Sequence, residues 1–336
     1  MKTFLNIGYI QLCDAAPIIM AGELGYYKDE GVCVNLTREV GWASIINKLV
    51  MGQLDCAHAL GSAPLAATIG MNNRPVPCGT ALVLNSGGNG ITLSKAVWER
   101  GVSNAEDFRA EVRSSRWSRT YTLGVVSPIS THRYILSKWL DSCKLREGED
   151  VQIVTIPPGQ AMRNLAAGTL DGFCVGDPWH SLAVKQGIGW TVALGEELVP
   201  GAAEKVLMVR QEFAEKRVEE HHAVIRAIVR ACEYCQSPEN AKHVGSTLSK
   251  RSYVNVDATV LSNIFQGKYK FGSTRERVDD SLINFYHPKV NRPAEVHAKW
   301  FRDVLIESPQ QQFEEIIKNV PLKEVFWESI YDAALS

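Results

Sequence analysis

An internal duplication constrains the fold of this chain more than any other feature. The run Leu49–Asp55 (LVMGQLD) recurs as Leu165–Asp171 (LAAGTLD), so the pattern Leu-x-x-Gly-x-Leu-Asp occurs twice, 116 residues apart. Each copy closes a helix-like stretch, Ala43–Met51 or Gln160–Ala167, with the glycine that commonly follows a helix. A short apolar strand comes after each Leu-Asp pair. Both copies therefore predict a βαβ crossover on a parallel sheet.

The similarity extends to the elements that precede each motif. In both halves a strand, a helix and a second strand come first: Phe4–Ile10, Pro17–Leu24 and Val32–Leu36 in one, and Tyr121–Val126, His132–Leu140 and Val151–Val154 in the other. Two copies of β-α-β-α-β predict two similar α/β lobes rather than one large sheet. Chance similarity is the alternative, because a glycine after a helix is common.

The remaining segments indicate how the chain divides between the lobes. The glycine-dense segment Leu84–Ile91 predicts a connector or hinge between the copies. Strands are expected at Trp190–Leu194 and Val206–Val209, and the chain from Gln211 onward is mostly helical. We predict an α/β fold with residues 1–86 plus 204–336 in lobe 1, residues 87–203 in lobe 2, and a ligand cleft between them.

Composition excludes several classes of function. The chain has 336 residues, which is long for a single hydrophobic core. Its 36 basic and 37 acidic side chains leave no excess charge for a phosphate backbone, so direct nucleic-acid binding is not expected. No apolar run approaches the roughly 18 residues that a membrane-spanning helix needs, so no membrane segment is expected.

The N-terminus and the cysteines favour a cytoplasmic protein. Met1–Ile10 has neither an apolar leader core nor a small-residue cleavage site, and is instead typical of an opening strand. Among the eight cysteines, Cys56 and Cys174 lie in apolar stretches, where reduced thiols act as small hydrophobic groups. Cys232 and Cys235 have redox or zinc spacing, but they lie in a helical run and no second pair accompanies them, so a structural role is expected.

Helix-opening turns indicate the chemistry of the cleft. Ligands of parallel α/β sheets bind beyond the carboxyl ends of the strands, where helix N-termini attract anions. Four such turns occur, at Cys13–Pro17, Val40–Ala43, Pro128–His132 and Pro157–Gln160. They contain few carboxylates, so a small anion fits this cleft better than a cation.

Catalytic motifs are missing from the sequence. It contains no Gly-x-Ser-x-Gly elbow, no phosphate loop and no His-Glu-x-x-His, and Gly87–Gly90 does not match the dinucleotide fingerprint. Asp177–His180 could form a metal or acid–base cluster, but a structural turn with a packed tryptophan is the favoured interpretation. We therefore expect a protein that is not an enzyme and that needs no cofactor or metal.

A family resemblance adds to these inferences. The matching stretches are Asp14–Pro17, Trp42–Ser44, Asn89–Thr92, Thr131–His132, Val175–Trp179, Glu204–Val206 and Arg292–Pro293 through Trp300–Phe301. In their order and spacing they resemble the nitrate- and bicarbonate-binding proteins of the NrtA/CmpA type, over nearly the whole chain. The resemblance implies a type II periplasmic-binding-protein fold, in agreement with the duplication.

The resemblance also implies a set of ligand-binding residues, namely Trp42, Gly88, Asn89, Gly90, His132 and Lys205. Asn89 stands where the family has a glutamine, which leaves the size of the anion open. For the bicarbonate-binding branch, the resemblance implies an acidic residue and a metal near the position of Lys205. A lysine at this position therefore favours nitrate or nitrite. Each of three residues also has a purely structural alternative. Lys205 could be an exposed lysine at a strand edge, His132 could only cap a helix, and Trp42 could belong to the core.

The expected role follows from the same resemblance and from the apparent lack of a leader. The chain is most similar to the cytoplasmic nitrate/nitrite sensors of NasS–NasT systems. That similarity implies an RNA-binding antiterminator partner of the ANTAR class, held by the ligand-free sensor and released by nitrate or nitrite. One alternative is the receptor of a nitrate ABC importer whose leader has been removed. Another is an enzyme similar to thiamine-pyrimidine synthases, which would need a cofactor-binding lysine and a cysteine-rich iron motif.

Overall fold

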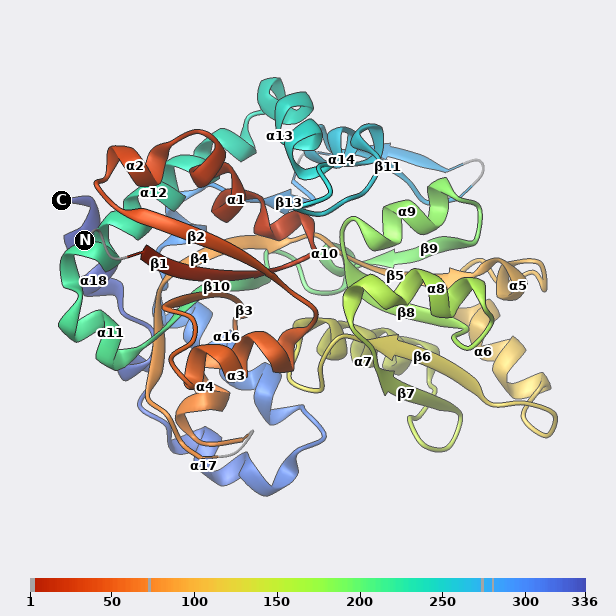
Figure 1. Ribbon diagram of the computed structural model, residues 1–336. Coiled ribbons are helices and arrows are strands. Elements are labelled where there is room, and N and C mark those ends of the chain that lie inside the picture. The colour runs from red at the N-terminus through yellow and green to blue at the C-terminus, as the bar shows by residue number, and fades with distance from the viewer. Residues whose placement is uncertain (1–3, 72–73, 273–274, 280) are drawn as a thin grey trace.

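The computed structural model describes residues 4–71, 74–272, 275–279 and 281–336. Figure 1 shows two α/β lobes side by side, each built on its own sheet and flanked by helices. The first lobe has the strand order β13-β4-β10-β3-β1-β2, with β1 Phe4–Ile10, β2 Cys33–Glu39, β3 Cys56–Leu60, β4 Cys78–Gly87, β10 Ala203–Arg210 and β13 Ile283–Asn284. The second has the order β7-β6-β8-β5-β9, with β5 Asn89–Ser94, β6 Tyr121–Val125, β7 Val151–Thr155, β8 Gly172–Gly176 and β9 Gly189–Leu194.

Helices surround both sheets. Around the first lobe lie α1 Ala16–Glu23, α2 Tyr26–Asp29, α3 Trp42–Val50, α4 Ala63–Thr68, α11 Gln211–Lys216, α12 Val218–Gln236, α13 Ala241–Leu248, α14 Ala258–Phe265, α15 Pro288–Asn291, α16 Glu295–Ile306, α17 Glu314–Asn319 and α18 Glu328–Leu335. The second lobe carries α5 Lys95–Trp98, α6 Ala105–Ser114, α7 Thr131–Cys143, α8 Ala161–Ala166, α9 Trp179–Lys185 and α10 Gly195–Leu198. Within the described ranges, no helix is long and apolar enough to cross a membrane.

The duplication predicted from the sequence is confirmed. In the first lobe β1 pairs in parallel with β2 and β3, and in the second β6 pairs in parallel with β7 and β8. An antiparallel strand follows at the same place in each sheet, β10 beside β3 and β5 beside β8. The motif glycines end their helices with left-handed backbone, φ 77° at Gly52 and 71° at Gly168, which a residue with a side chain rarely adopts.

The aspartate that ends each motif explains why the pattern recurs. Asp55 Oδ2 accepts the backbone N–H of Asn6 at 2.8 Å, while the Asp55 N–H donates to the Asn6 carbonyl at 2.9 Å. Asp171 makes the same two contacts with Thr122, both at 2.8 Å. Each aspartate thus joins the start of the last strand of its unit to the first strand, in both lobes.

The glycine-dense segment predicted as a connector or hinge consists of strand residues apart from Gly88 and passes from one sheet to the other. β4 continues to Gly87 and β5 begins at Asn89, so the chain runs almost directly from one sheet into the other. Gly87 and Gly88 have positive φ, 70° and 88°, and the Gly88 N–H donates to the Leu282 carbonyl at 2.7 Å. The reason is burial, because buried backbone groups must be hydrogen-bonded and strand pairing satisfies them.

The chain after Gln211 contains short strands as well as the expected helices. The ribbon of β11 (Lys268–Lys270) and β12 (Glu276–Val278) follows α14 and lies beside α9 and β9 of the second lobe (Figure 1). There the Thr191 N–H donates to the Phe271 carbonyl at 2.9 Å, and the rings of His180 and Tyr269 stack at 6.2 Å. The C-terminal region therefore contacts both lobes.

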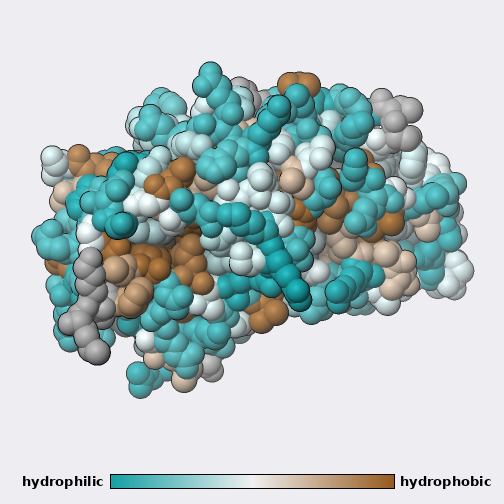
Figure 2. Space-filling view, turned by 45° about the horizontal axis from the view of Figure 1, so that its top comes forward, coloured by the Kyte–Doolittle hydropathy of each residue, from teal (hydrophilic) through white to brown (hydrophobic). Residues whose placement is uncertain are grey.

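The surface and the cysteines agree with a well-packed molecule. On the face shown in Figure 2, hydrophilic residues cover most of the surface and hydrophobic ones gather in separate patches.

All eight cysteines are free and seven of them are buried. Cys232 and Cys235 lie inside α12 with fully buried thiols, and burial holds the pKa of both well above the usual value. Their position matches the structural role expected from the sequence.

Candidate functional site

The helix-opening turns of both lobes meet at the junction between the sheets. The short 3-10 helix Cys13–Ala15 carries Asp14, α3 begins at Trp42, and α7 begins with Thr131 and His132. The second and fourth turns also face each other, since a Cβ on Gly41 would lie 3.9 Å from the Cβ of Pro157. The cleft predicted from the sequence is thus a closed junction in this structure.

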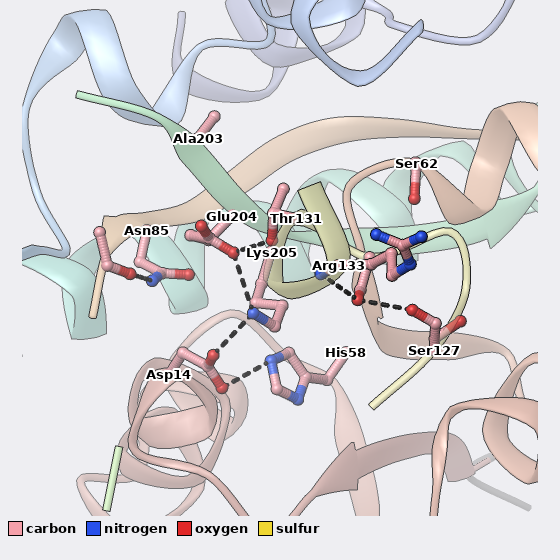
Figure 3. Close-up of polar contacts among 12 residues, drawn as sticks. Asp14, His58, Ser62, Asn85, Ser127, Thr131, Arg133, Ala203, Glu204 and Lys205 are labelled. Carbon is pink, nitrogen blue, oxygen red and sulfur yellow. Dashed lines mark hydrogen bonds and ion pairs between the residues drawn. The ribbon is translucent and has the colours of Figure 1, made fainter. Parts of the chain in front are cut away.

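Lys205 lies at the centre of this junction (Figure 3). Its Nζ is 3.1 Å from Asp14 Oδ2 and 3.3 Å from Glu204 Oε2, and the side chain is 0% exposed. The ammonium also lies 5.7 Å from the centre of the Trp42 ring. A lysine is almost never buried without such partners. Lys205 therefore belongs to a built polar cluster and is not an exposed edge residue.

His58 extends the cluster on the Asp14 side. Its Nδ1 accepts the backbone N–H of Ile10 at 3.3 Å, so in the neutral ring Nε2 carries the proton. That Nε2 lies 3.1 Å from Asp14 Oδ1, a close contact without hydrogen-bond alignment. The His58 ring also packs edge-on against Trp42, with centroids 5.4 Å apart. His58 thus supports both Asp14 and Trp42 from β3.

Glu204 reaches the same place through an irregularity in β10. Consecutive residues of a regular strand point to opposite faces of the sheet. In β10, however, the pairing with β4 changes register between Ala203 and Lys205 and again after Lys205. A bulge of this kind re-aims side chains, so Glu204 and Lys205 can meet. From the second lobe, the Thr131 hydroxyl donates to Glu204 Oε2.

The environment sets the charges of the three ionisable groups around Lys205. Burial disfavours the ammonium of Lys205, but Asp14 and Glu204 outweigh it and raise its pKa. Burial likewise opposes ionisation of Asp14, yet Lys205 and His58 together lower the pKa of this carboxyl. For Glu204 burial dominates and raises the pKa, although Lys205 counteracts part of it. Asp14 and Lys205 form the ionised pair, and Glu204 is the carboxyl that binds a proton most readily.

Polar atoms from both lobes lie buried at the junction without hydrogen-bond partners among the described residues. They are Nε1 of Trp42, both ring nitrogens of His132, Nδ2 of Asn89 and Oε1 of Glu204. Burial, with Lys205 adding to it, lowers the pKa of His132 well below its usual value, so this ring is neutral. Buried polar groups left without partners are costly. A polar ligand bound here would satisfy several of them at once.

The structure gathers most of the site residues expected from the sequence. Trp42 and Lys205 lie in the first lobe, and Asn89 and His132 in the second. Gly176 brings the second pair together, since a Cβ there would lie 3.3 Å from Asn89 Oδ1 and 3.6 Å from His132 Nε2. The N-cap of α7 is Ser130 and not His132, which lies inside the first turn, so the capping alternative for the histidine is wrong.

Gly88 and Gly90, the two glycines expected at the site, use backbone groups for pairing within the protein. The Gly88 N–H donates to the Leu282 carbonyl, and Gly90 is paired on both sides, with Val175 and with Leu194. Gly90 also allows the His180 ring to approach, since a Cβ there would lie 2.9 Å from Cγ of His180. Both glycines connect the lobes, and direct contact of either with a ligand stays a prediction.

Sequence reasoning missed Asp14, His58 and Glu204. The four helix-opening turns hold one carboxylate, Asp14, as few as expected, but Glu204 of β10 brings a second carboxylate to Lys205. The ammonium is consequently not a free cation, and its presence alone does not separate nitrate from bicarbonate. A charged Glu-Lys pair in an otherwise apolar strand was the signal that could have shown this. Across the described residues, no group of three or more His, Cys, Asp or Glu side chains could hold a metal ion.

Further contacts hold the lobes together around the site. The Cys13 N–H donates to the Asp177 carbonyl at 2.8 Å, and Nε1 of Trp179 donates to the Gln11 carbonyl at 3.1 Å. Asp177 Oδ1 lies 3.0 Å from His180 Nε2. The segment Asp177–His180 is thus the structural turn with a packed tryptophan that was favoured from the sequence.

Comparison with known proteins agrees with this geometry. The nitrate import ATP-binding protein NrtC of Synechocystis sp. strain PCC 6803 is 35% identical, over 98% of this chain and 50% of its own length. The bicarbonate transport ATP-binding protein CmpC of Synechococcus elongatus strain PCC 7942 is 33% identical, over 89% of this chain and 44% of its own length. The chain spans about half the length of the curated relatives it matches.

A solved structure is similar over almost the whole chain. The crystal structure of the periplasmic nitrate-binding protein NrtA from Synechocystis PCC 6803 has a TM-score of 0.89 and 25% identity, covering 99% of this chain and 88% of that one. It confirms the type II periplasmic-binding-protein fold and the resemblance to the NrtA/CmpA type. The sequence profile of the NMT1-like family matches residues 1–249, which include Trp42, His132 and Lys205. The chain therefore belongs to the NMT1-like family.

Proposed function

We propose that this protein binds nitrate or nitrite between its two lobes, as a binding protein and not as an enzyme. The observation that carries the proposal is the buried Lys205 ammonium, with donors from both lobes nearby that have no hydrogen-bond partner in the described part of the chain. A monovalent planar anion offers acceptors to the Trp42 indole, the Asn89 amide and the His132 ring. The names of NrtA and NrtC support nitrate, and the name of CmpC makes bicarbonate the competing anion.

Isothermal titration calorimetry of the purified chain tests the proposal. Nitrate or nitrite should bind, bicarbonate should bind more weakly, and divalent sulfate should not bind. Lys205→Ala should weaken nitrate binding at least tenfold, which is about 1.4 kcal/mol. Lys250→Ala is the matched control, because this lysine is half exposed and pairs with Glu23 at the surface. Absence of nitrate and nitrite binding at millimolar concentration would refute the proposal.

For its cellular role, the favoured candidate is a cytoplasmic sensor of nitrate or nitrite. In the ligand-free state it would hold an RNA-binding antiterminator of the ANTAR class, and the ligand would release that partner to switch on nitrate assimilation genes. The near-neutral charge supports leaving RNA contact to the partner. Release requires the ligand to favour one lobe arrangement, and the shift cannot exceed that preference.

An importer's receptor is the second candidate, and the names of the relatives are equally consistent with it. Two measurements separate the roles. Cell fractionation should place the full-length protein with cytoplasmic markers, and an immobilised protein should retain the antiterminator only without nitrate. Recovery from the periplasm or the membrane, with no nitrate-dependent partner, would favour the importer.

A further inference from the structure

The polar cluster at the junction holds one more carboxylate than it holds cations. Lys205 Nζ lies between Asp14 Oδ2 at 3.1 Å and Glu204 Oε2 at 3.3 Å, and all three side chains are buried. Asp14 and Lys205 neutralise each other, so an ionised Glu204 leaves one net negative charge. A bound anion would add a second negative charge in a place where water does not screen it, and like charges there repel strongly.

We propose that Glu204 is the specificity-determining residue of the junction site and takes up one proton from solvent when nitrate binds beside Lys205, an inference that rests on the anion site proposed above. With Glu204 ionised, the two carboxylates, nitrate and Lys205 would sum to a net charge of −2, and protonation of Glu204 reduces that sum to −1. The partial charge of the α7 N-terminus offsets part of the remainder.

The contacts of the two carboxylates explain why Glu204 is the one to be protonated. Asp14 faces both Lys205 and His58, each at 3.1 Å. Glu204 contacts Lys205 and the hydroxyl of Thr131, Asn89 lies close enough to lower its pKa, and its Oε1 is buried without a hydrogen-bond partner among the described residues. Burial raises the pKa of Glu204, whereas Lys205 and His58 hold that of Asp14 below its usual range in spite of burial.

Other titratable groups lie in or beside the cluster that contains Glu204. They are Lys205 from β10, Asp14 from the 3-10 helix, His58 from β3, His132 from α7 and Cys174 from β8. Burial keeps the pKa of the Cys174 thiol well above its usual value, with Glu204 adding to it, so that group stays protonated. His132 stays neutral because burial and then Lys205 lower its pKa. His58 and His132 are therefore the rival proton acceptors to be tested.

Protonation also changes which anion the site prefers. A neutral carboxyl has one O–H donor, and nitrate has only acceptor atoms, so protonated Glu204 can donate to it. An ionised carboxylate can only accept, which suits the O–H group of bicarbonate. Lower pH should thus favour nitrate over bicarbonate at this site. Glu204→Gln imitates the protonated state of Glu204 at every pH, because the glutamine amide donates a hydrogen bond and carries no charge.

Calorimetry with nitrate, between about pH 5 and pH 8 and in two buffers of different ionisation enthalpy, measures the proton count. Nitrate itself does not titrate in this range. The wild-type protein should take up close to one proton at the alkaline end, where its Kd should rise up to about tenfold per pH unit. Glu204→Gln should bind nitrate with a nearly constant Kd and no proton uptake, while His132→Gln should bind more weakly and keep the uptake.

The outcomes separate this inference from the proposed function. Nitrate binding by the wild-type protein without proton uptake would overturn the role of Glu204 and leave the anion site intact. Proton uptake that persists in Glu204→Gln would assign the proton to His58 or His132 and would also overturn it. No nitrate binding at any pH would refute both. If Glu204→Gln does not fold, the two-buffer measurement on His58→Gln and His132→Gln decides: uptake that survives in both variants supports Glu204, and uptake lost in either one overturns its role.

Discussion

At the scale of residues, Trp42 offers a ligand one hydrogen-bond donor, the Nε1 atom of its indole ring. Its indole N–H is buried and has no hydrogen-bond partner within the described ranges, while its ring packs against His58 and lies over the Lys205 ammonium. The donor and the ring can therefore be separated by substitution. Trp42→Phe keeps an aromatic ring in the same place and removes only the unpartnered N–H and part of the ring area.

The expected result of Trp42→Phe is a divergence between binding and stability. Nitrate affinity should fall by about 1 kcal/mol, close to fivefold to tenfold, because one hydrogen bond to the ligand is lost. The lost N–H has no partner among the residues that the structure describes, so the stability of the ligand-free protein should fall only by the packing lost with part of the ring. Calorimetry and thermal unfolding of the same preparation measure both. Unchanged nitrate affinity would show that Trp42 does not contact the ligand.

How much of the site could be predicted also depends on single residues. Trp42, His132 and Lys205 follow helix-opening turns or a family pattern, and the structure brings them to one junction. Glu204 could not be found in this way, because alternation along a strand would turn it away from Lys205. The register change in β10 that reverses this is caused by pairing with β4, more than a hundred residues earlier in the chain.

At the scale of elements, the two aspartates of the duplicated motif make equivalent contacts and should contribute equally to the free energy of unfolding. Asp55→Ala and Asp171→Ala should each lower the free energy of unfolding by about 1–3 kcal/mol, since each leaves a backbone N–H without its carboxylate. Asp303→Ala, at a half-exposed position beside Arg302, should change it by less than about 0.5 kcal/mol. Urea unfolding measures the three midpoints. Midpoints of both motif variants equal to that of the wild type would contradict the equivalence.

Elements were predicted well where their signal is local. The strand at Phe4–Ile10 and the helices after it follow from apolar periodicity and terminal glycines, and the repeat fixed their order. The segment Leu84–Ile91 was predicted as a connector from its glycines but forms two strands. Its conformation depends on buried partners, including Leu282, that lie far away in the sequence.

Helix α12 contributes a pH dependence of stability. Burial, with a smaller effect of His222, lowers the pKa of His221 to about 4. The folded state therefore keeps this ring neutral, while the unfolded chain binds a proton near pH 6.5. Stability from this group is present above pH 6.5 and is lost as pH falls toward 4, by up to about 1.4 kcal/mol per pH unit.

His221→Gln should accordingly flatten the acid side of the stability curve relative to the wild-type protein. The same substitution at His222, which is less buried, is the control and should follow the wild type. Urea midpoints measured between about pH 4 and pH 7 give the slopes. Parallel slopes for wild type and His221→Gln would show that other groups, such as His132, account for the whole acid sensitivity.

At the scale of the whole molecule, the structure is a closed form. Contacts between the lobes include Thr131 with Glu204, Nζ of Lys138 with Glu307 at 2.9 Å, and the ring of Tyr134 against Trp300 at 4.9 Å. The first of these involves the ligand cluster itself, and the other two join α7 to α16 and to Glu307, the residue directly after α16. Closure and the arrangement of the site are therefore coupled through α7.

Thr131→Val should shift this equilibrium toward an open form. The substitution keeps the shape of the side chain and removes the hydroxyl that joins Glu204 to the second lobe. Loss of one hydrogen bond to a buried carboxyl should favour opening by about tenfold. Small-angle scattering of the ligand-free protein should show a larger radius of gyration. Thr169→Val, at an exposed position of the second lobe, should scatter like the wild type, and identical curves for Thr131→Val would contradict the coupling.

The complete burial of Lys205 has a kinetic consequence. With this ammonium 0% exposed, an anion cannot enter or leave while the lobes stay together. Exchange is then gated, and the observed association rate should level off at high anion concentration at the rate of lobe separation. Residence time would be set by how often the molecule opens, so substitutions remote from the anion could lengthen or shorten its stay while barely changing its immediate contacts.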